Sequence, residues 1–173
     1  MKLLKTEVAF ATPWFELVAK TLDTGEAPYY SLRLSDYAAI VAVTGEGRVL
    51  AVRQYRPAVE RYTIELPSGV VDGGEDPSES ARRELIEETG YEALALEPLG
   101  PLFPDNGRLG NHLWSYLARD VRKASGREPE PGIEVLSYSS SELARAVVEG
   151  EFDHALHVAS LLLAVLKGGI ELR

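Results

Sequence analysis

The sequence predicts an α/β fold in which a mixed β-sheet carries helices on its faces and a small antiparallel β-sheet comes first. Three observations support this prediction. Segments of alternating polarity occupy residues 1–35, apolar runs bounded by glycine and proline follow, and helical patterns occur in the middle and at the C-terminal end. This order of strands, helix, strands and two helices suits a sheet covered by helices.

The first 35 residues are expected to form three strands. Residues 3–10 and 14–21 alternate in polarity, a turn follows, and Tyr29–Leu34 alternates again. Such a small sheet buries little apolar surface by itself. We therefore divide the chain into an N-terminal sheet, residues 1–35, and a main domain, residues 36–173, and expect the sheet to lean on that domain or on a second copy.

The main domain begins with strands separated by turns. Tyr37–Val43 is a continuous apolar run, which is typical of a strand covered on both faces. Extended segments are also predicted at Val49–Tyr55, Tyr62–Leu66, Ala93–Phe103, His112–Arg119 and Ile133–Tyr138. Composition predicts a loop at residues 104–111 and a polar segment at residues 120–131.

A central helix is predicted between Asp76 and Gly90. Asp76 can cap free backbone N–H groups, Pro77 suits the first turn, and Gly90 is a natural stop. Two more helices are predicted near the C-terminus. The first has a capping box formed by Ser139 with the glutamate three residues later, and the second is an apolar helix capped by Asp153.

One face of the central helix is acidic, because Glu84, Glu87 and Glu88 lie within roughly 100° of each other around the helix axis. Like charges at this spacing repel each other, and a hard divalent cation would remove the repulsion. Mg²⁺, or Mn²⁺ in its place, takes oxygen ligands of this kind. Without further context, the same cluster could be a solvated helix face.

Composition excludes several classes of function. The chain has 173 residues, 45% of them hydrophobic and 26% charged, which is typical of one soluble domain. Its net charge of −9 argues against nucleic acid as a partner, and the absence of cysteine removes thiolate chemistry. We find no signal-peptide pattern and no run that could span a membrane, so we expect a cytoplasmic enzyme without a membrane partner.

The stretch from Gly69 to Tyr91 resembles the signature of the Nudix hydrolases. In that signature, glycine, glutamate, Arg-Glu, an apolar residue, Glu-Glu, glycine and an apolar residue recur at fixed spacing. The corresponding positions are Gly69, Glu75, Arg83, Glu84, Leu85, Glu87, Glu88, Gly90 and Tyr91, and only Tyr91 departs from the usual aliphatic residue. The resemblance implies the Nudix α/β/α sandwich.

The resemblance also implies a metal site. Its ligands would be Glu84, Glu88 and the backbone carbonyl of Ser68, and Glu87 would share a metal ion or its bound water. Arg83 lies one helical turn from both Glu79 and Glu87 and is expected to orient a carboxylate.

A second resemblance concerns the substrate. Arg53–Pro57 and Ile64–Gly69 are similar to the run before the signature in ADP-ribose and nucleoside-diphosphate-sugar pyrophosphatases. This similarity implies that Arg56 reaches the substrate and that Glu65 supports the metal site. A guanidinium group can pair with phosphate through two hydrogen bonds. Alternatively, Arg56 is a surface residue at the end of a strand.

In that branch, the N-terminal sheet contributes aromatic residues that stack on the base, partly across a dimer interface. Trp14 and Tyr29 or Tyr30 occupy comparable places. Stacking on a base is favourable for any aromatic side chain. Aromatic residues in strands often serve packing alone, so both interpretations remain open.

Loops outside the signature supply the last candidates. The branch places a catalytic glutamate before the strand at residues 133–138, and either Glu128 or Glu130 could fill this role or belong to a solvated linker. ADP-ribose hydrolases usually carry a proline sixteen residues after the last glycine of the signature, whereas Pro104 comes fourteen residues after Gly90. Arg108, in the same loop, could therefore contact a different sugar or phosphate.

Together, these observations predict a metal-dependent hydrolase of a nucleoside diphosphate linked to a sugar, with ADP-ribose or an ADP-sugar favoured. The products would be a nucleoside monophosphate and a sugar phosphate, and the enzyme would be a homodimer. The alternatives are a GDP-sugar, a dinucleoside polyphosphate or a modified nucleoside triphosphate as substrate, or a non-catalytic nucleotide-sugar-binding domain. His154 and His157 are not expected to form a second metal site, because no third ligand is near in the sequence.

Overall fold

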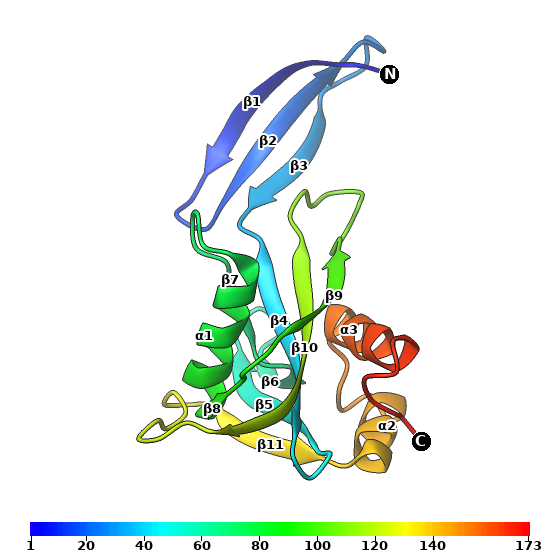
Figure 1. The fold of residues 1–173 in the computed structure, drawn as a ribbon. Coiled ribbons are helices and arrows are strands. Elements are labelled where there is room, and N and C mark those ends of the chain that lie inside the picture. Colours follow the sequence, from blue (N-terminus) through cyan, green and yellow to red (C-terminus); the bar gives the residue numbers. More distant parts are fainter.

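The computed structural model describes all 173 residues, which form two β-sheets and three α-helices (Figure 1). The first sheet is antiparallel, has the order β1-β2-β3, and extends away from the rest of the molecule. Its strands are β1 (Leu3–Ala11), β2 (Phe15–Leu22) and β3 (Tyr29–Leu34). The prediction of a small N-terminal antiparallel sheet is therefore confirmed.

The second sheet contains eight strands and is mixed. Its main path is β11-β5-β4-β10-β8, while β6 pairs with β5, β7 with β4, and β9 with β10. Only β4 and β10 run parallel to each other. The strands are β4 (Tyr37–Thr44), β5 (Val49–Arg56), β6 (Arg61–Glu65), β7 (Ser68–Val70), β8 (Tyr91–Glu92), β9 (Glu97–Leu102), β10 (Leu113–Lys123) and β11 (Glu134–Tyr138).

Helices cover both faces of this sheet, as the sequence predicts (Figure 1). Helix α1 (Pro77–Thr89) lies on one face, and α2 (Ser140–Val148) and α3 (Ala155–Leu166) lie on the other. Successive residues of a strand point to opposite faces. Accordingly, Ile40 packs in the core under α1, whereas Val41 packs in the core under α2 and α3. The long apolar run of β4 is explained by this double burial.

The caps at the start of the helices follow the sequence, with one exception. Asp76 accepts a hydrogen bond from the Ser78 backbone N–H at 2.8 Å and caps α1, and Ser139 forms the predicted capping box of α2. The prediction that Asp153 caps the last helix is wrong. His154 caps α3, because Asp153 forms an ion pair with Arg61.

Three strand segments differ from the sequence prediction. Strand β7 lies in a stretch for which the sequence analysis predicts no strand, and it forms because Ser68 and Gly69 pair with β4. Strand β8 is a two-residue pairing with β10, which itself continues to Lys123 inside the segment predicted as a polar loop. Asp120, at φ 55°, lies at an irregularity that lets β10 resume its pairing at Val121.

The N-terminal sheet is joined to the main sheet through the loop at residues 104–111. The Leu32 N–H donates a hydrogen bond to the Arg108 carbonyl at 2.8 Å, and Leu32 forms a bridge with Leu109. The Arg108 guanidinium lies 4.5 Å from the centre of the Tyr29 ring, which adds a cation–π contact. At the opposite edge of the N-terminal sheet, every residue of β1 is exposed.

No helix of the structure has the length and apolar character that crossing a membrane requires.

Packing of α1 on the sheet can be tested at Leu85, which is completely buried. Leu85→Ala should lower the free energy of unfolding by about 2–5 kcal/mol, because the substitution leaves a cavity that the neighbours fill only in part. The measurement is urea unfolding followed by circular dichroism. Leu94→Ala is the control, because Leu94 is 80% exposed. Equal stability of the two variants would contradict the proposed packing.

Candidate functional site

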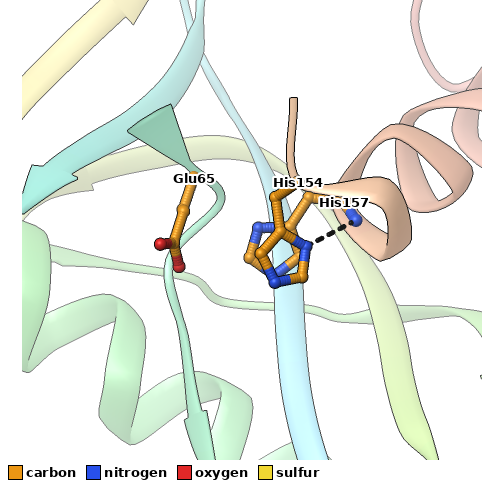
Figure 2. Close-up of side chains that lie close together, drawn as sticks. All are labelled: Glu65, His154 and His157. Carbon is orange, nitrogen blue, oxygen red and sulfur yellow. Dashed lines mark hydrogen bonds between the residues drawn. The ribbon is translucent and has the colours of Figure 1, made fainter. Parts of the chain in front are cut away.

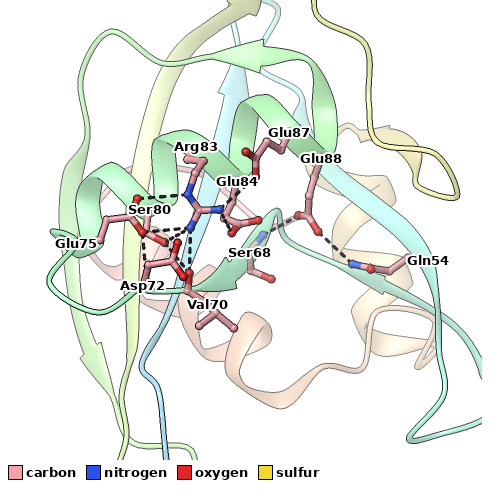
Figure 3. A network of polar contacts seen from close by, with 10 residues as sticks. All are labelled: Gln54, Ser68, Val70, Asp72, Glu75, Ser80, Arg83, Glu84, Glu87 and Glu88. Atoms are coloured by element: carbon pink, nitrogen blue, oxygen red, sulfur yellow. Dashed lines mark hydrogen bonds and ion pairs between the residues drawn. The ribbon is translucent and has the colours of Figure 1, made fainter. Parts of the chain in front are cut away.

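Two clusters of ionisable side chains lie at the same end of the main sheet. One surrounds Glu65 on β6 and includes two histidines at the start of α3 (Figure 2). The other lies on α1, where Arg83 and the glutamates of the helix face β7 (Figure 3). Ser68 and Gly69 lie between them and line a cavity together with Glu65. We describe the α1 cluster first.

Glu88 is buried and is held by two hydrogen bonds from other elements. Its Oε2 accepts one from the Ser68 backbone N–H at 2.8 Å, and its Oε1 accepts one from Gln54 at 3.3 Å (Figure 3). Burial raises the pKa of Glu88 to about 7, against the effect of these donors, and the nearby charge of Glu84 raises it further. The carboxylate is therefore oriented, but its negative charge lacks full compensation.

Arg83 lies at the centre of the remaining carboxylates. Its Nη1 donates to Glu84 at 2.5 Å and to Glu87 at 3.2 Å, while its Nη2 donates to Glu75 at 3.2 Å and to the Val70 carbonyl at 3.0 Å. One guanidinium group thus holds three carboxylates and the backbone of β7 in a defined arrangement. The bond to Glu87 agrees with the sequence expectation.

The sequence leaves Glu79 open as an alternative partner of Arg83, and the structure does not use this alternative. Glu79 pairs with Arg82, with 3.5 Å between the charged atoms. Arg83 instead points toward β7 and toward Glu75 in the preceding loop, where more carboxylate oxygens are available.

The approach of α1 to β7 is possible only because residue 69 is glycine. A Cβ atom at Gly69 would lie 2.1 Å from the carboxyl carbon of Glu84, which is far inside van der Waals contact. Glu84 therefore rests directly on the backbone of β7. Its pKa is raised, mainly by burial and in part by the charges of Glu87 and Glu130.

These groups fit a hard divalent cation. The side chains that converge here offer carboxylate oxygens, which are the ligands that Mg²⁺ and Mn²⁺ prefer. Glu84 and Glu88 both have raised pKa values, so a cation between them would relieve a cost that the fold imposes. The backbone of Ser68, which carries the carbonyl expected as a ligand, lies beside Glu88.

The loop before β11 also reaches this cluster. The Glu130 backbone N–H donates to the Glu87 carbonyl at 2.9 Å, and the charge of Glu130 acts on Glu84. Glu128 lies instead near Gly90, at the C-terminal end of α1. Of the two loop glutamates that the sequence leaves open, the structure thus brings Glu130 close to the carboxylates of α1.

Arg56 and Glu65 form a bidentate ion pair on neighbouring strands. Arg56 Nε and Nη2 donate to the two carboxylate oxygens at 2.8 and 2.7 Å. Burial would raise the pKa of Glu65, but hydrogen bonds from Arg56 and Thr63 lower it to about 2, so the carboxylate stays charged. The Nη1 group of Arg56 has no hydrogen-bond partner in the protein and is free to bind a ligand.

A cavity of about 550 Å³ lies against this ion pair. Arg56, Glu65, Ser68 and Gly69 line one side, and the first turn of α3 lines another. Pro104 and Leu109 come from the loop that contacts the N-terminal sheet. A ligand in this cavity would contact Arg56 and the backbone of β7, on which the Glu84 carboxylate rests.

The structure does not bring every candidate residue to this site. Trp14 is 77% exposed and Tyr30 is 48% exposed, and neither residue lines the cavity. Arg108 carries its guanidinium over Tyr29 and does not line the cavity. Within one chain, these three residues therefore lie outside the lining of the cavity.

Two groups of residues at the site are not among the functional residues that the sequence predicts. Gln54, which holds Glu88, could have been found by strand alternation, because it is two residues from Arg56 and therefore shares its face of β5. The histidine pair is the second group. The expectation that no third metal-ligating residue lies near His154 and His157 is wrong, because ligand-type atoms of Glu65 and both histidines lie within 4.8 Å of one another (Figure 2). No local pattern signals this contact.

Comparison with known proteins identifies the family. Residues 34–156 match the model of the NUDIX domain. The methanol dehydrogenase activator of Bacillus methanolicus is 29% identical over 86% of this chain and 83% of its own length. The ADP-ribose pyrophosphatase of Bacillus subtilis is 37% identical over 48% of this chain, and the match spans 45% of that relative.

Among solved structures, an ADP compounds hydrolase superimposes with a TM-score of 0.79, covers 98% of this chain and 96% of its own, and is 22% identical. This similarity shows a common fold. The domain match includes β4, α1 and β11 together with the carboxylates of α1. The chain therefore belongs to the Nudix hydrolase family, and within it the chain resembles the ADP-ribose pyrophosphatases.

Proposed function

We propose that the protein is a cytoplasmic, Mg²⁺- or Mn²⁺-dependent hydrolase of a nucleoside diphosphate linked to a sugar, with ADP-ribose or an ADP-sugar as the favoured substrate. The reaction would give a nucleoside monophosphate and a sugar phosphate. The observation that carries the proposal is the position of Glu84 and Glu88 beside β7, next to a cavity lined by Arg56. The similarity to an ADP-ribose pyrophosphatase supports this choice of substrate.

The residues of α1 and β7 would hold the metal. Glu84, Glu88 and the Ser68 carbonyl are the proposed ligands, and Glu87 would share an ion or its water. A divalent cation bound there would polarise phosphate oxygens and favour ionisation of water. Gly69 admits the Glu84 carboxylate, and Arg83 keeps Glu84 and Glu87 in place.

The substrate would be oriented by residues of β5 and β6 that line the cavity. Arg56 can donate from its free Nη1 group to a phosphate oxygen, while Glu65 fixes the direction of the guanidinium. Glu130 is the proposed loop base that removes a proton from the attacking water, because its loop is hydrogen-bonded to α1 and its charge acts on Glu84.

We further propose that residues 1–35 form a separate dimerisation unit and supply a base-binding surface to the partner. The exposed side chains of β1 and the exposure of Trp14 and Tyr30 support this assignment. Arg108 would then act beside the base or sugar from its position over Tyr29.

The direct test of the proposed function is hydrolysis of a panel of nucleotides with Mg²⁺ or Mn²⁺, followed by mass spectrometry of the products. ADP-ribose and ADP-sugars should be cleaved to AMP and a sugar phosphate. If a GDP-sugar, a dinucleoside polyphosphate or a modified nucleoside triphosphate is cleaved faster, that compound is the preferred substrate in place of ADP-ribose. Binding of ADP-ribose without any product would make the protein a nucleotide-sugar-binding domain.

Glu88→Gln tests the metal role, because glutamine can still accept the hydrogen bond from Ser68 but carries no charge. We expect kcat to fall about a hundredfold or more, with a large increase in the Mg²⁺ concentration needed for half-maximal activity. Glu79→Gln on the same helix is the control, because Glu79 is exposed and pairs with Arg82. Full activity of Glu88→Gln at low Mg²⁺ would exclude Glu88 as a ligand.

Gly69→Ala tests the contact between β7 and Glu84. The added methyl group would occupy the position of the Glu84 carboxylate, so we expect a loss of Mg²⁺ affinity and of activity of about tenfold to a hundredfold. Gly73→Ala is the matched control in the loop that follows β7, because a Cβ atom there meets nothing within 4 Å. Titration calorimetry with Mg²⁺ would show the difference, and similar affinities of the two variants would contradict this geometry.

The raised pKa of Glu88 gives a pH-dependent prediction for the metal-free protein. An acid whose pKa is about 7 when folded and near 4.5 when unfolded binds its proton more tightly in the folded state. Glu88 should therefore reduce stability progressively as the pH rises from about 4.5 to 7. The Tm measured in EDTA should therefore fall less over this pH range for Glu88→Gln than for the parent protein. Parallel profiles would show that the carboxyl group has an ordinary pKa.

A further inference from the structure

The start of α3 carries two stacked histidines that the proposed hydrolysis does not use. The rings of His154 and His157 are 3.8 Å apart with an angle of 22° between their planes, and both line the cavity beside Glu65. Figure 2 shows the stacked pair next to the Glu65 carboxylate. His157 is only 2% exposed, so its polar atoms need partners inside the protein or from a ligand.

The hydrogen bonds of the two rings determine where their protons lie. His157 Nδ1 accepts the Leu66 backbone N–H at 3.0 Å, and His154 Nδ1 accepts the His157 backbone N–H at 3.4 Å. A neutral imidazole that accepts at Nδ1 carries its proton on Nε2. Both rings therefore offer an Nε2–H donor, and neither of these groups has a hydrogen-bond partner in the protein.

Burial supports the neutral form of His157. It lowers the pKa of this imidazole to about 3, and the neighbouring His154 lowers it in the same direction. The donor is thus an uncharged N–H group.

This arrangement disfavours a metal ion, although three ligand-type residues meet here. A metal at Nε2 would need a lone pair there, while Nδ1 already uses its own lone pair to accept a backbone N–H. Metal-bound histidines instead donate a hydrogen bond from the second nitrogen. Glu65 is also engaged, because both of its oxygens accept hydrogen bonds from Arg56.

A hydroxyl group of a ligand can form hydrogen bonds with both the histidines and Glu65. The Nε2–H groups require an acceptor. Glu65 Oε1 already accepts from Arg56 and Thr63, whereas Oε2 accepts only from Arg56 and can take one more donor. A phosphate oxygen would meet the negative charge of Glu65, whereas a hydroxyl oxygen can accept from an imidazole and donate to the carboxylate. Two hydrogen bonds of about 2.8 Å meeting near the tetrahedral angle span about 4.6 Å. One ring nitrogen of each histidine and one carboxylate oxygen of Glu65 lie within 4.8 Å of one another, which is compatible with this span.

We propose that His154, His157 and Glu65 form a subsite that binds a hydroxyl group of the sugar part of the substrate. This inference rests on the proposed function for the identity of the ligand. The subsite makes the enzyme selective for a polyhydroxy group on the distal side of the diphosphate. His154 and His157 bind substrate here and take no part in the movement of protons.

Three variants distinguish hydrogen-bond donation by the Nε2–H groups from the structural contacts that the rings make through Nδ1. His154→Asn keeps an acceptor that can cap α3 but lacks the distal N–H. His157→Asn similarly keeps an acceptor for Leu66 and loses the donor, whereas His157→Gln restores a donor near the Nε2 position. His112→Asn is the control, because His112 does not line the cavity. Thermal unfolding verifies that each variant folds.

The test is titration calorimetry in EDTA, which prevents turnover, with two ligands. ADP-ribose contains the sugar, and the methyl ester of ADP has the same nucleotide and diphosphate without it. We expect His154→Asn and His157→Asn to weaken binding of ADP-ribose about tenfold and to leave binding of methyl-ADP unchanged. His157→Gln should recover most of the lost affinity. With Mg²⁺, the Asn variants should raise KM for ADP-ribose more than they lower kcat.

The outcomes separate this inference from the proposed function. Equal weakening for both ligands, or no weakening, would overturn the sugar subsite even if ADP-ribose is hydrolysed. The expected ligand-specific loss without hydrolysis by the parent protein would support the subsite and overturn the proposed function. No binding of ADP-ribose to the parent protein in EDTA, together with no hydrolysis in Mg²⁺, would overturn both. Stoichiometric binding of Zn²⁺ that disappears in His154→Asn would show a metal site in place of a hydroxyl subsite.

Discussion

The contact between α1 and β7 is the constraint on which the site depends. Packing of Leu85 and Ala81 in the core presses the helix onto the sheet, and Gly69 allows the Glu84 carboxylate to lie against the backbone of β7. The same packing removes Glu88 from water and gives it only two hydrogen-bond donors. The acidic face of the helix thus carries negative charge that is only partly compensated, and a divalent cation would compensate it.

Two arginines organise the remaining charges around this contact. Arg83 gathers Glu75, Glu84 and Glu87 from the helix and the loop before it. Arg56 pairs with Glu65 and keeps its pKa low, so this carboxylate remains charged beside the cavity. In a protein with a net charge of −9, both cations are thus paired with carboxylates, and the Nη1 group of Arg56 is left without a partner for an anionic ligand.

The cavity joins parts of the chain that are far apart in sequence. One side belongs to β6 and β7, another to the first turn of α3, and a third to the loop at residues 104–111. That loop is also hydrogen-bonded to β3, so the N-terminal sheet is coupled to the cavity through Leu32 and Arg108. The groups proposed to cleave the diphosphate and those proposed to select the sugar therefore come from different elements.

The sequence by itself determined the features that depend on near neighbours. The cap at Asp76, the stop at Gly90, the acidic face of α1 and the capping box at Ser139 follow from residues a few positions apart, and the structure contains all four. The alternation of polarity likewise predicted the three strands of the N-terminal sheet. These signals are reliable because each reflects a local helical or extended periodicity.

Only the tertiary structure decided which of these elements meet. The short pairing of β7 with β4, the engagement of Arg56 by Glu65, the proximity of Glu130 to Glu84, and the position of His154 and His157 beside Glu65 arise from contacts across strands or across the chain. Asp153 illustrates the same effect, since its ion pair with Arg61 leaves the cap of α3 to His154. Periodicity within one segment contains no information on such contacts, because their energies depend on residues brought together by folding.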